Sequence, residues 1–137
     1  MAITAVYLYT DGACSKNPGP GSIGVLLLDN SGNELEIFKE PIGHTTNNRA
    51  EYRALIKGLD LAAKHCRHTV YCYLDSELVV KQLNGVFRLK NDELRDLFHK
   101  VKDLERAFRR VEYNHVAREN SNIRRVDRLA QEALTGP

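Results

Sequence analysis

The amino-acid sequence predicts an α/β protein in which helices pack on a five-stranded mixed sheet. Three β-like segments come first, and helix-like segments then alternate with two further strands, in the order βββ-α-β-α-α-β-α. Three strands in succession favour an antiparallel meander, whereas strands separated by helices favour parallel crossover connections. The chain has 137 residues and no internal repeat, low-complexity tract or linker, so we expect one domain spanning 1–137.

The first three strands are bounded by loop and turn residues. The first is rich in β-branched and aromatic side chains and ends at Asp11-Gly12. A loop with two prolines follows at 15–21, and a turn at 29–33 separates the second strand from the third. The expected strands cover residues 4–10, 22–28 and 34–42.

The rest of the chain is mostly helical. A cluster of N-capping residues, Thr45-Thr46-Asn47-Asn48, begins a helix that runs to about His65. Strands are expected over 69–74 and 111–116, and further helices over 76–84 (ended by Gly85), 92–108 and 122–134.

Composition excludes several classes of protein. Hydrophobic residues make up 42% and charged residues 28%, which are globular values. The longest clearly apolar stretch, Val25–Leu28, is far too short to span a membrane, and the strand-like start of the sequence leads us to expect no secretory signal. The three cysteines are odd in number and form no C-x-x-C pair, which indicates reduced thiols. We therefore expect a cytoplasmic protein without membrane contact.

The net charge of +2 hides an uneven distribution. Residues 81–128 hold 13 Lys and Arg against 8 Asp and Glu, whereas the other 89 residues hold 7 against 10. The basic stretch fits a phosphate-binding surface. It also fits a solvated helix laced with ion pairs, and charge alone favours that second interpretation.

A glycine pattern at 19–24 matches G-x-G-x-x-G, the dinucleotide-binding fingerprint. Such glycines must follow a strand and open a helix whose N-terminus binds pyrophosphate. Here they follow a proline-containing loop and open a β-like run. We therefore predict no nucleotide site, and expect these glycines to serve a tight turn and close strand approach.

Two aspartates follow predicted strands. Asp11 closes the first strand and Asp75 closes the fourth, where the carboxyl ends of strands commonly form ligand sites. Each aspartate taken alone is more typical of a turn or a helix cap than of a functional site.

Glu51 is harder to explain structurally. At helical spacing it shares one face with Leu55, Gly58, Leu59 and Ala62, so a carboxylate begins an apolar stripe. A buried carboxylate needs a cation, a hydrogen-bond network or a raised pKa. No lysine or arginine on that stripe supplies the partner.

Asp127 repeats this pattern near the start of the last helix. It shares a face with Ala130 and Leu134, although a surface pair with a neighbouring arginine explains it equally well. Four carboxylates from separate elements, if they converge, would form an all-oxygen site suited to Mg²⁺ or Mn²⁺.

Together these residues resemble the motifs of type 1 ribonuclease H, in the order of that family and over nearly the whole chain. The matching segments are Tyr9–Gly21, Thr45–Glu51, Leu74–Ser76, and His115 with Arg118–Asn120 and Asp127–Ala130. The resemblance implies the ribonuclease H-like fold, with helices on both faces of the sheet.

The resemblance also implies an endonuclease that cuts the RNA strand of RNA–DNA hybrids, leaving 5′-phosphate and 3′-hydroxyl ends. Its metal ligands would be Asp11, Glu51, Asp75 and Asp127, holding two Mg²⁺ in the substrate complex, with Mn²⁺ as an alternative. Hydrolysis in line uses one ion to generate the nucleophile and one to stabilise the leaving oxygen. His115 would match the mobile histidine that helps product departure.

Substrate contacts are implied in the same way. A protein distinguishes RNA from DNA through the 2′-hydroxyl, for which short polar side chains suffice. The minor groove would be lined by Cys14, Asn17, Asn47 and Asn48, and a DNA-strand phosphate would be held by Thr46 and Asn91. Thr46 and Asn47 are also suited to helix capping, and both roles can coexist.

One departure from the family concerns the segment after the third motif. Many members carry a basic helix and a Trp-rich segment there, whereas this chain passes almost directly to the next long helix and has no Trp. We expect a short form with weaker, more salt-sensitive hybrid binding, in which Lys81, Arg88 and Lys90 partly replace the missing segment.

Three functions remain open at this point. The first is a metal-dependent endonuclease for hybrids, expected to be monomeric and able in principle to act on double-stranded RNA. The second is a non-catalytic module that binds hybrid or double-stranded RNA, which four clustered acids disfavour. The third is a DNA-cutting relative such as a transposase or resolvase nuclease domain, which the Thr-Thr-Asn-Asn and Asn-Pro-Gly-Pro-Gly segments disfavour.

Overall fold

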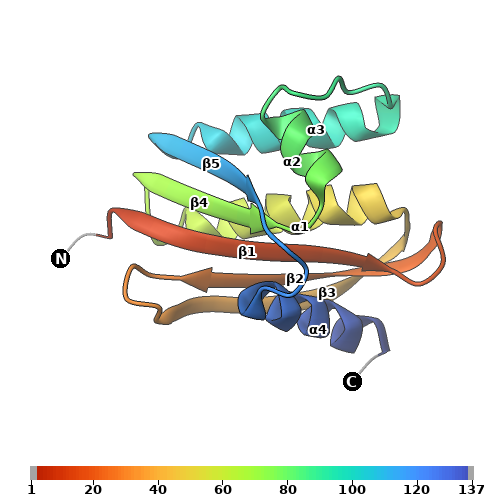
Figure 1. The fold of residues 1–137 in the computed structure, drawn as a ribbon, viewed down its shortest axis with the longest axis horizontal. Coiled ribbons are helices and arrows are strands. Elements are labelled where there is room, and N and C mark those ends of the chain that lie inside the picture. Colours follow the sequence, from red (N-terminus) through yellow and green to blue (C-terminus); the bar gives the residue numbers. More distant parts are fainter. Residues whose placement is uncertain (1–2, 136–137) are drawn as a thin grey trace.

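The computed structural model describes residues 3–135, which form one five-stranded sheet and four helices (Figure 1). The elements are β1 (Ala5–Cys14), β2 (Gly19–Leu28), β3 (Glu34–Thr45), α1 (Asn47–Ala62), β4 (Thr69–Leu74), α2 (Glu77–Leu83), α3 (Asp92–Glu105), β5 (Arg110–His115) and α4 (Ser121–Thr135). The predicted order of strands and helices is confirmed.

The sheet is mixed, as predicted. Its strand order is β3-β2-β1-β4-β5. The first three strands form the antiparallel meander, while β4 pairs in parallel with β1, and β5 in parallel with β4. The carboxyl ends of the three parallel strands therefore lie at one edge of the sheet, and their amino ends lie at the opposite edge.

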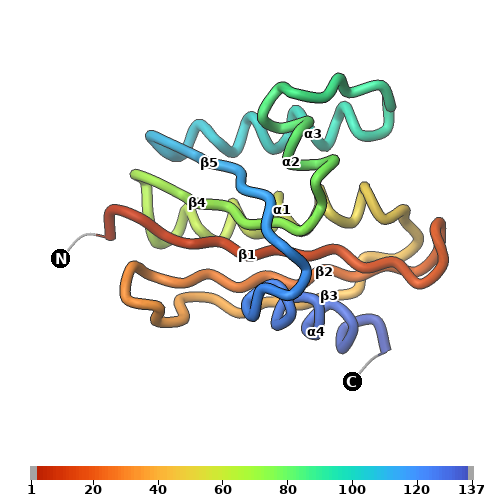
Figure 2. Tube along the Cα trace, viewed as in Figure 1, coloured from red at the N-terminus to blue at the C-terminus, as the bar shows by residue number. Residues whose placement is uncertain are grey.

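Helices cover both faces of the sheet. Figure 1 shows α4 in front of the strands, with α1 behind them and α2 and α3 above α1. The larger core lies on the α1 side, where Tyr52, Leu55 and Leu59 are fully buried against β1 and β4. Figure 2 shows the chain leaving β5, passing the end of β4, crossing in front of β1 and entering α4 on the other face. This crossing brings α4 to the carboxyl edge.

Several predicted boundaries were wrong. β1 runs to Cys14, so Asp11 lies inside the strand opposite Gly24 and does not close it. β2 begins at Gly19, within the predicted loop, because the β1–β2 hairpin pairs as far as Cys14 and Gly21. β3 likewise continues to Thr45. Hairpin pairing thus overrides the local loop-forming residues.

Two predicted helices end early. α1 ends at Ala62 instead of His65, and α3 ends at Glu105 instead of residue 108. The residues beyond each helix are held in single turns, since His65 and Phe108 donate backbone hydrogen bonds to carbonyls three residues back. These turns lead directly into β4 and β5.

The glycine pattern at 19–24 lies in β2 and is followed by β3, so these glycines do not open a helix as the dinucleotide fingerprint requires. Gly24 has a packing role instead. A Cβ at this position would lie 2.3 Å from the Val126 carbonyl oxygen of α4. The missing side chain lets α4 pack directly on β2.

Two features considered from composition can be located in the structure. Cys14, Cys66 and Cys72 are all free thiols. Among residues 3–135, no helix combines the length and apolar character needed to cross a bilayer.

Candidate active site

Three carboxylates from three separate elements meet at the carboxyl edge of the sheet. Asp11 comes from β1, Glu51 from the first turns of α1, and Asp75 from the residue after β4. One oxygen from each lies within 4.8 Å of the others. Asp11 and Glu51 are only 5% and 7% exposed. The convergence expected of these acids is therefore present.

Glu51 is positioned by a direct contact between strand and helix. The Gly12 backbone N–H donates a 3.1 Å hydrogen bond to Glu51 Oε1. A Cβ at Gly12 would lie 2.2 Å from the carbonyl carbon of Ala50, so only glycine lets α1 approach this closely. The close approach sets Glu51 beside Asp11.

Burial and like charge raise the pKa of both interior acids. For Asp11 the main cause is burial, followed by the negative charge of Glu51 and a hydrogen bond between the two side chains. For Glu51 burial again dominates, and hydrogen bonds from Asp11 and Gly12 only partly offset it. The site is therefore costly to ionise without a compensating cation.

The donor set suits a divalent cation. Glu51 Oε2 is buried and has no hydrogen-bond partner among residues 3–135. A cation shared by the three acids would use this oxygen and neutralise their repulsion. Because every donor is a carboxylate oxygen, the site fits Mg²⁺ or Mn²⁺ better than a soft metal.

Asp127 lines the same cleft but is unlike the other three acids. The cleft has a volume of about 480 Å³, and Asp127 enters it from α4. Asp127 is exposed and lies outside the tight cluster, although its hydrogen bond contributes to the raised pKa of Asp11. It makes no ion pair with a described arginine, so the alternative of an Asp–Arg surface pair is not seen in the structure.

His115 does not line this cleft. It is exposed at the end of β5, where its charge contributes to lowering the pKa of Glu77. The structure thus places the histidine beside α2 and apart from the three close carboxylates.

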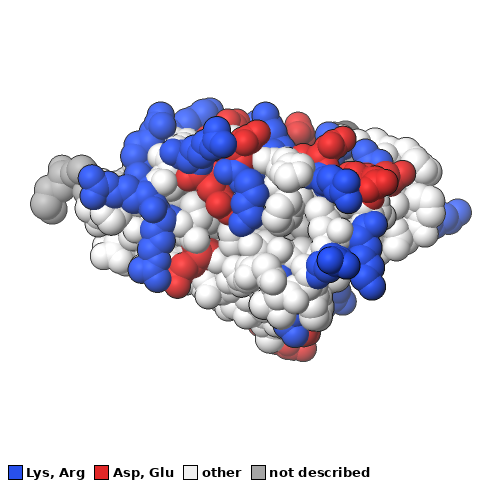
Figure 3. Space-filling view, turned by 90° about the horizontal axis from the view of Figure 1, so that it is seen from above, with Lys and Arg blue, Asp and Glu red and all other residues white. Residues whose placement is uncertain are grey.

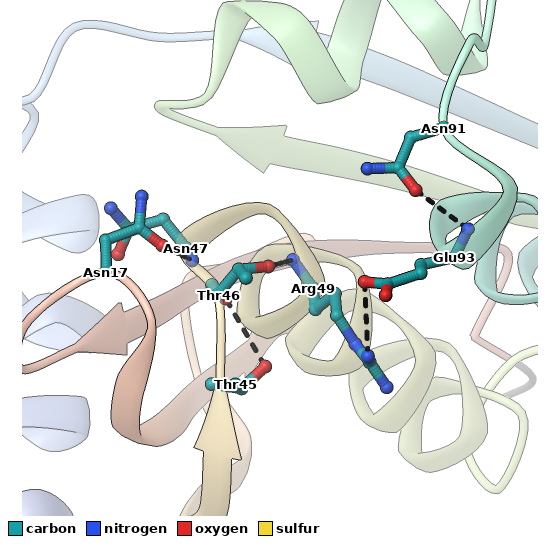
Figure 4. Close-up of polar contacts among 7 residues, drawn as sticks. All are labelled: Asn17, Thr45, Thr46, Asn47, Arg49, Asn91 and Glu93. Carbon is teal, nitrogen blue, oxygen red and sulfur yellow. Dashed lines mark hydrogen bonds and ion pairs between the residues drawn. The ribbon is translucent and has the colours of Figure 1, made fainter.

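The residues expected in the minor groove lie along one wall of the cleft. Cys14, Asn47 and Asn48 line it directly. Asn17 supports that wall, because its Oδ1 accepts a 3.0 Å hydrogen bond from the Asn47 backbone N–H (Figure 4). The Cys14 thiol is turned to the carbonyl oxygens of Lys16, Gly19 and Thr45.

Thr46 and Asn91 are both helix caps. Thr46 Oγ1 accepts a 3.3 Å hydrogen bond from the Arg49 N–H, and Asn91 Oδ1 accepts a 2.7 Å bond from the Glu93 N–H. An ion pair of 3.5 Å between Arg49 and Glu93 joins the two helix starts. Figure 4 shows the amide nitrogen of Asn91 pointing away from Glu93, where it is free to donate to a ligand.

The basic stretch 81–128 divides into parts with different surroundings. Arg88 and Lys90 line a groove of about 570 Å³ together with Asn48 and Asn91, next to the acidic cleft. Within α3, Arg95 and Lys102 pair with neighbouring acids at 3.2 Å. Arg109 and Arg110 lie at the amino edge of the sheet. The ion-paired helix that charge alone favours is therefore seen at Arg95 and Lys102, while the other cations named here lie on separate surfaces.

The cleft is also lined by five residues that were not predicted as site residues, Gly12, Ala13, Ser76, Arg118 and Gln131, and the last two are long polar side chains. Arg118 Nε lies 3.5 Å from Asp75 Oδ2, and its charge partly offsets the raised pKa of Glu51. Gln131 lines the cleft one helical turn after Asp127. Helical spacing from Asp127 predicts Gln131 on the same face, whereas nothing local predicts the direction of Arg118.

Known proteins resemble this chain over almost its full length. The family described as "Reverse transcriptase-like" matches residues 9–133. Ribonuclease HI of Halobacterium salinarum is 37% identical over 129 residues, covering 94% of this chain and 64% of that protein. The bifunctional protein Rv2228c of Mycobacterium tuberculosis is 38% identical over 131 residues, covering 94% of this chain but 35% of its own length. The chain thus spans about a third of one relative and just under two thirds of the other.

Solved structures agree with these sequence matches. The crystal structure of RNase H1 from H. salinarum superposes with a TM-score of 0.90 at 36% identity, covering 96% of this chain and 98% of that one. LC11-RNase H1, solved in complex with an RNA/DNA hybrid, gives a TM-score of 0.87 at 36% identity, covering 95% and 96%. Both fold and sequence define a ribonuclease H-like protein. The chain belongs to the type 1 ribonuclease H family of enzymes.

Proposed function

We propose that this protein hydrolyses the RNA strand of RNA–DNA hybrids endonucleolytically, in one catalytic domain spanning 1–137. The observation that carries the proposal is the cluster of Asp11, Glu51 and Asp75, with a buried, unpartnered Glu51 oxygen. Clustered acids repel a phosphate backbone unless cations lie between them, so binding alone does not account for them. The hybrid bound by LC11-RNase H1 supports the choice of substrate.

The four acids have different tasks in this proposal. Asp11, Glu51 and Asp75 would hold divalent ions, and Asp127 would complete the set from α4. When bound, two such ions supply the nucleophile at neutral pH and stabilise the leaving oxygen of an in-line displacement. The products would carry 5′-phosphate and 3′-hydroxyl ends. Gly12 keeps Glu51 in place through its N–H, and Arg118 offsets negative charge beside Asp75.

Substrate recognition would use the polar wall of the cleft. Cys14, Asn47 and Asn48 face the cleft, where short polar groups can test for the 2′-hydroxyl. Thr46 and Asn91 would hold a phosphate of the DNA strand, and Arg88 and Lys90 line the groove beside Asn91. His115, exposed at the end of β5, would assist product departure. We further propose a monomer that acts in the cytoplasm, with double-stranded RNA as a second substrate.

Cleavage of matched duplexes tests this proposal. Hybrid, double-stranded RNA and double-stranded DNA of one sequence are incubated with Mg²⁺, Mn²⁺ or a chelator, and the product ends are identified. We expect Mg²⁺- or Mn²⁺-dependent cutting of the RNA strand of the hybrid and intact double-stranded DNA. Asp11→Asn should abolish this cutting while the protein stays folded and still binds hybrid. Near-normal cleavage by Asp11→Asn would overturn the metal-site assignment.

A further inference from the structure

A second cleft lies at the amino edge of the sheet, away from the four acids. It has a volume of about 690 Å³ and lies between the start of β1, the connection from α1 to β4, and Arg109. Ala62 lies eleven positions after Glu51 in α1, which places the two edges about 16 Å apart at about 1.5 Å per residue. Nothing proposed above for hybrid cleavage uses this cleft.

Two loops form its charged rim. The backbone N–H of Arg109 donates to the carbonyl oxygens of Arg67 and His68, at 3.2 and 2.9 Å, and the N–H of Arg110 donates to His68 at 2.9 Å. These bonds join the loop before β5 to the loop before β4. Five exposed cations lie in or beside these two loops, Lys64, Arg67, Arg106, Arg109 and Arg110, and three of them, Lys64, Arg67 and Arg109, line the cleft. We call this group the amino-edge basic surface.

The surface carries little compensating negative charge. No Asp or Glu occurs between Asp60 and Asp75 or between Glu105 and Glu112. Within the part of the chain that the structure describes, Arg110 pairs with Glu112 at 3.0 Å, while the other four cations make no ion pair. Figure 3 shows several Lys and Arg side chains at the left end of the view, although others lie along the rest of this face. In α3, by contrast, Arg95 and Lys102 pair with acids of the same helix, although Lys100 makes no ion pair with a described residue.

We propose that the amino-edge basic surface binds the phosphate backbone of a second nucleic-acid segment while the first lies at the acidic cleft. Guanidinium groups are suited to phosphate oxygens because they donate two parallel hydrogen bonds. A cleft between two loops lets neighbouring arginines approach one phosphate from both sides. Nucleic acid bound at the carboxyl edge leaves the amino edge of the sheet open. The amino-edge basic surface would therefore contact the phosphate backbone of a separate nucleic-acid segment.

The composition of the rim favours nucleic acid over a lipid surface. Amphipathic membrane-binding surfaces combine cations with exposed large apolar side chains that enter the bilayer. Among the described residues, the large apolar side chains that are exposed are Ile37, Leu78, Val86 and Phe87, and none belongs to the two loops. The rim therefore offers charge without an apolar anchor, as expected for contacts to phosphates.

The test counts bound duplexes. A 12-base-pair RNA–DNA hybrid is titrated at low salt into the Asp11→Asn protein, with and without Arg67→Ala and Arg109→Ala, and the stoichiometry is measured by analytical ultracentrifugation. We expect two duplexes per protein with both arginines. Without them the second duplex should bind at least about 10-fold more weakly, with a salt slope smaller by about 1.8 for two lost phosphate contacts. A second double variant, Lys64→Ala with Arg106→Ala, tests other cations of the same surface and should also weaken binding of the second duplex.

Matched controls make the result decisive. Lys39→Ala with Lys57→Ala removes the same formal charge near the β3 edge and should leave two duplexes bound. Cleavage of the short hybrid by Arg67→Ala/Arg109→Ala, with Asp11 intact, should stay within about twofold of the parent protein, which separates this proposal from the proposed catalysis. Binding of only one duplex by the parent, an unchanged second duplex in both arginine pairs, or equal loss in the control would overturn the proposal. Equal binding of anionic vesicles through the same arginines would also overturn it, by making lipid the partner.

Discussion

The acids on the two faces of the sheet are held in different ways. Glu51 projects from α1 into a buried position, with one oxygen bonded to Gly12 and the other unpartnered within residues 3–135. Asp127 projects from α4 on the opposite face and stays exposed. Burial of the Glu51 carboxylate thus costs free energy before any cation binds, whereas the Asp127 carboxylate stays exposed to solvent and can change its conformation.

The difference indicates a division of tasks within one site. A buried carboxylate that cannot relax is pre-organised for a cation, and its position is fixed by packing in the main core. An exposed carboxylate costs little to ionise and can adjust as substrate and ions enter. Each acid depends on a glycine of a strand: Gly12 of β1 lets α1 approach, and Gly24 of β2 lets α4 approach.

The largest expected effect comes from two single variants, one that removes the charge of Glu51 and one that removes the charge of Asp127. Glu51→Gln should lower hydrolysis of the hybrid by more than about 100-fold, because even an outer partner of metal ligands typically contributes about 10- to 100-fold. Asp127→Asn should lower it less, by about 10- to 100-fold, since an exposed position lets other ligands substitute. The measurement is kcat/KM on hybrid over a range of Mg²⁺ concentrations. Equal losses in the two variants would contradict the proposed division of tasks.

The two glycines provide the next contrast. Gly12→Ala should lower the free energy of unfolding by about 1–3 kcal/mol or more, because its Cβ would meet the Ala50 backbone at 2.2 Å. Displacement of α1 moves Glu51, so cleavage should fall to the level of Glu51→Gln. The measurements are urea unfolding and kcat/KM.

Gly24→Ala is the matched change on the other face. Its Cβ would meet the Val126 carbonyl oxygen at 2.3 Å and push α4 outward. Cleavage should then fall only to the level of Asp127→Asn, and adding Asp127→Asn should cause little further loss. Full additivity of these two changes would show that Gly24 does not position Asp127.

Much of this arrangement can be predicted from sequence. The five strands and four helices follow from periodicity and turn residues, and the buried stripe beginning at Glu51 follows from helical spacing. Both are local properties of the chain. The motif order then places the remaining acids by resemblance.

Long-range packing accounts for what the sequence does not show. Asp11 lies inside β1 because hairpin pairing with β2 continues past the local turn residues. The roles of Gly12 and Gly24 depend on helices that come much later in the chain. Arg118 reaches Asp75 only because the chain crosses from β5 to α4 past the end of β4.

The free-energy cost of ionising the buried carboxyls of Asp11 and Glu51 predicts that the stability of the metal-free protein depends on pH. The folded-state pKa values of Asp11 and Glu51 are raised above 3.8 and 4.5, mainly by burial. The folded protein therefore retains protons that the unfolded chain releases, and this contribution to stability is full below about pH 4 and lost as pH rises through the raised values. In chelator, Tm should fall by several degrees between acidic and neutral pH, and Mg²⁺ should reverse the fall.

Variants separate this contribution from the rest of the protein. Asp11→Asn should raise the metal-free Tm at neutral pH and flatten its pH dependence, and Mg²⁺ should then stabilise little. Asp60→Asn, a change at an exposed acid of α1, should leave the pH dependence of Tm unchanged. A slope that persists in Asp11→Asn would place its origin outside the cluster.

The smallest expected effect concerns Thr46, which caps the start of α1 and is also proposed to bind substrate. Thr46 Oγ1 caps α1 through the Arg49 N–H, so Thr46→Ala should cost about 1 kcal/mol of unfolding free energy. If the hydroxyl also holds a DNA-strand phosphate, the same change raises KM for hybrid with little effect on kcat. Thr46→Ser keeps the hydroxyl and should restore both stability and KM.

Ser76→Ala removes the equivalent cap of α2, where the Val79 N–H donates to Ser76 Oγ, and should lower stability comparably. Since Ser76 has no proposed phosphate contact, KM for hybrid should stay unchanged in Ser76→Ala. An equal rise of KM in Thr46→Ala and Ser76→Ala would show that Thr46 acts only as a helix cap.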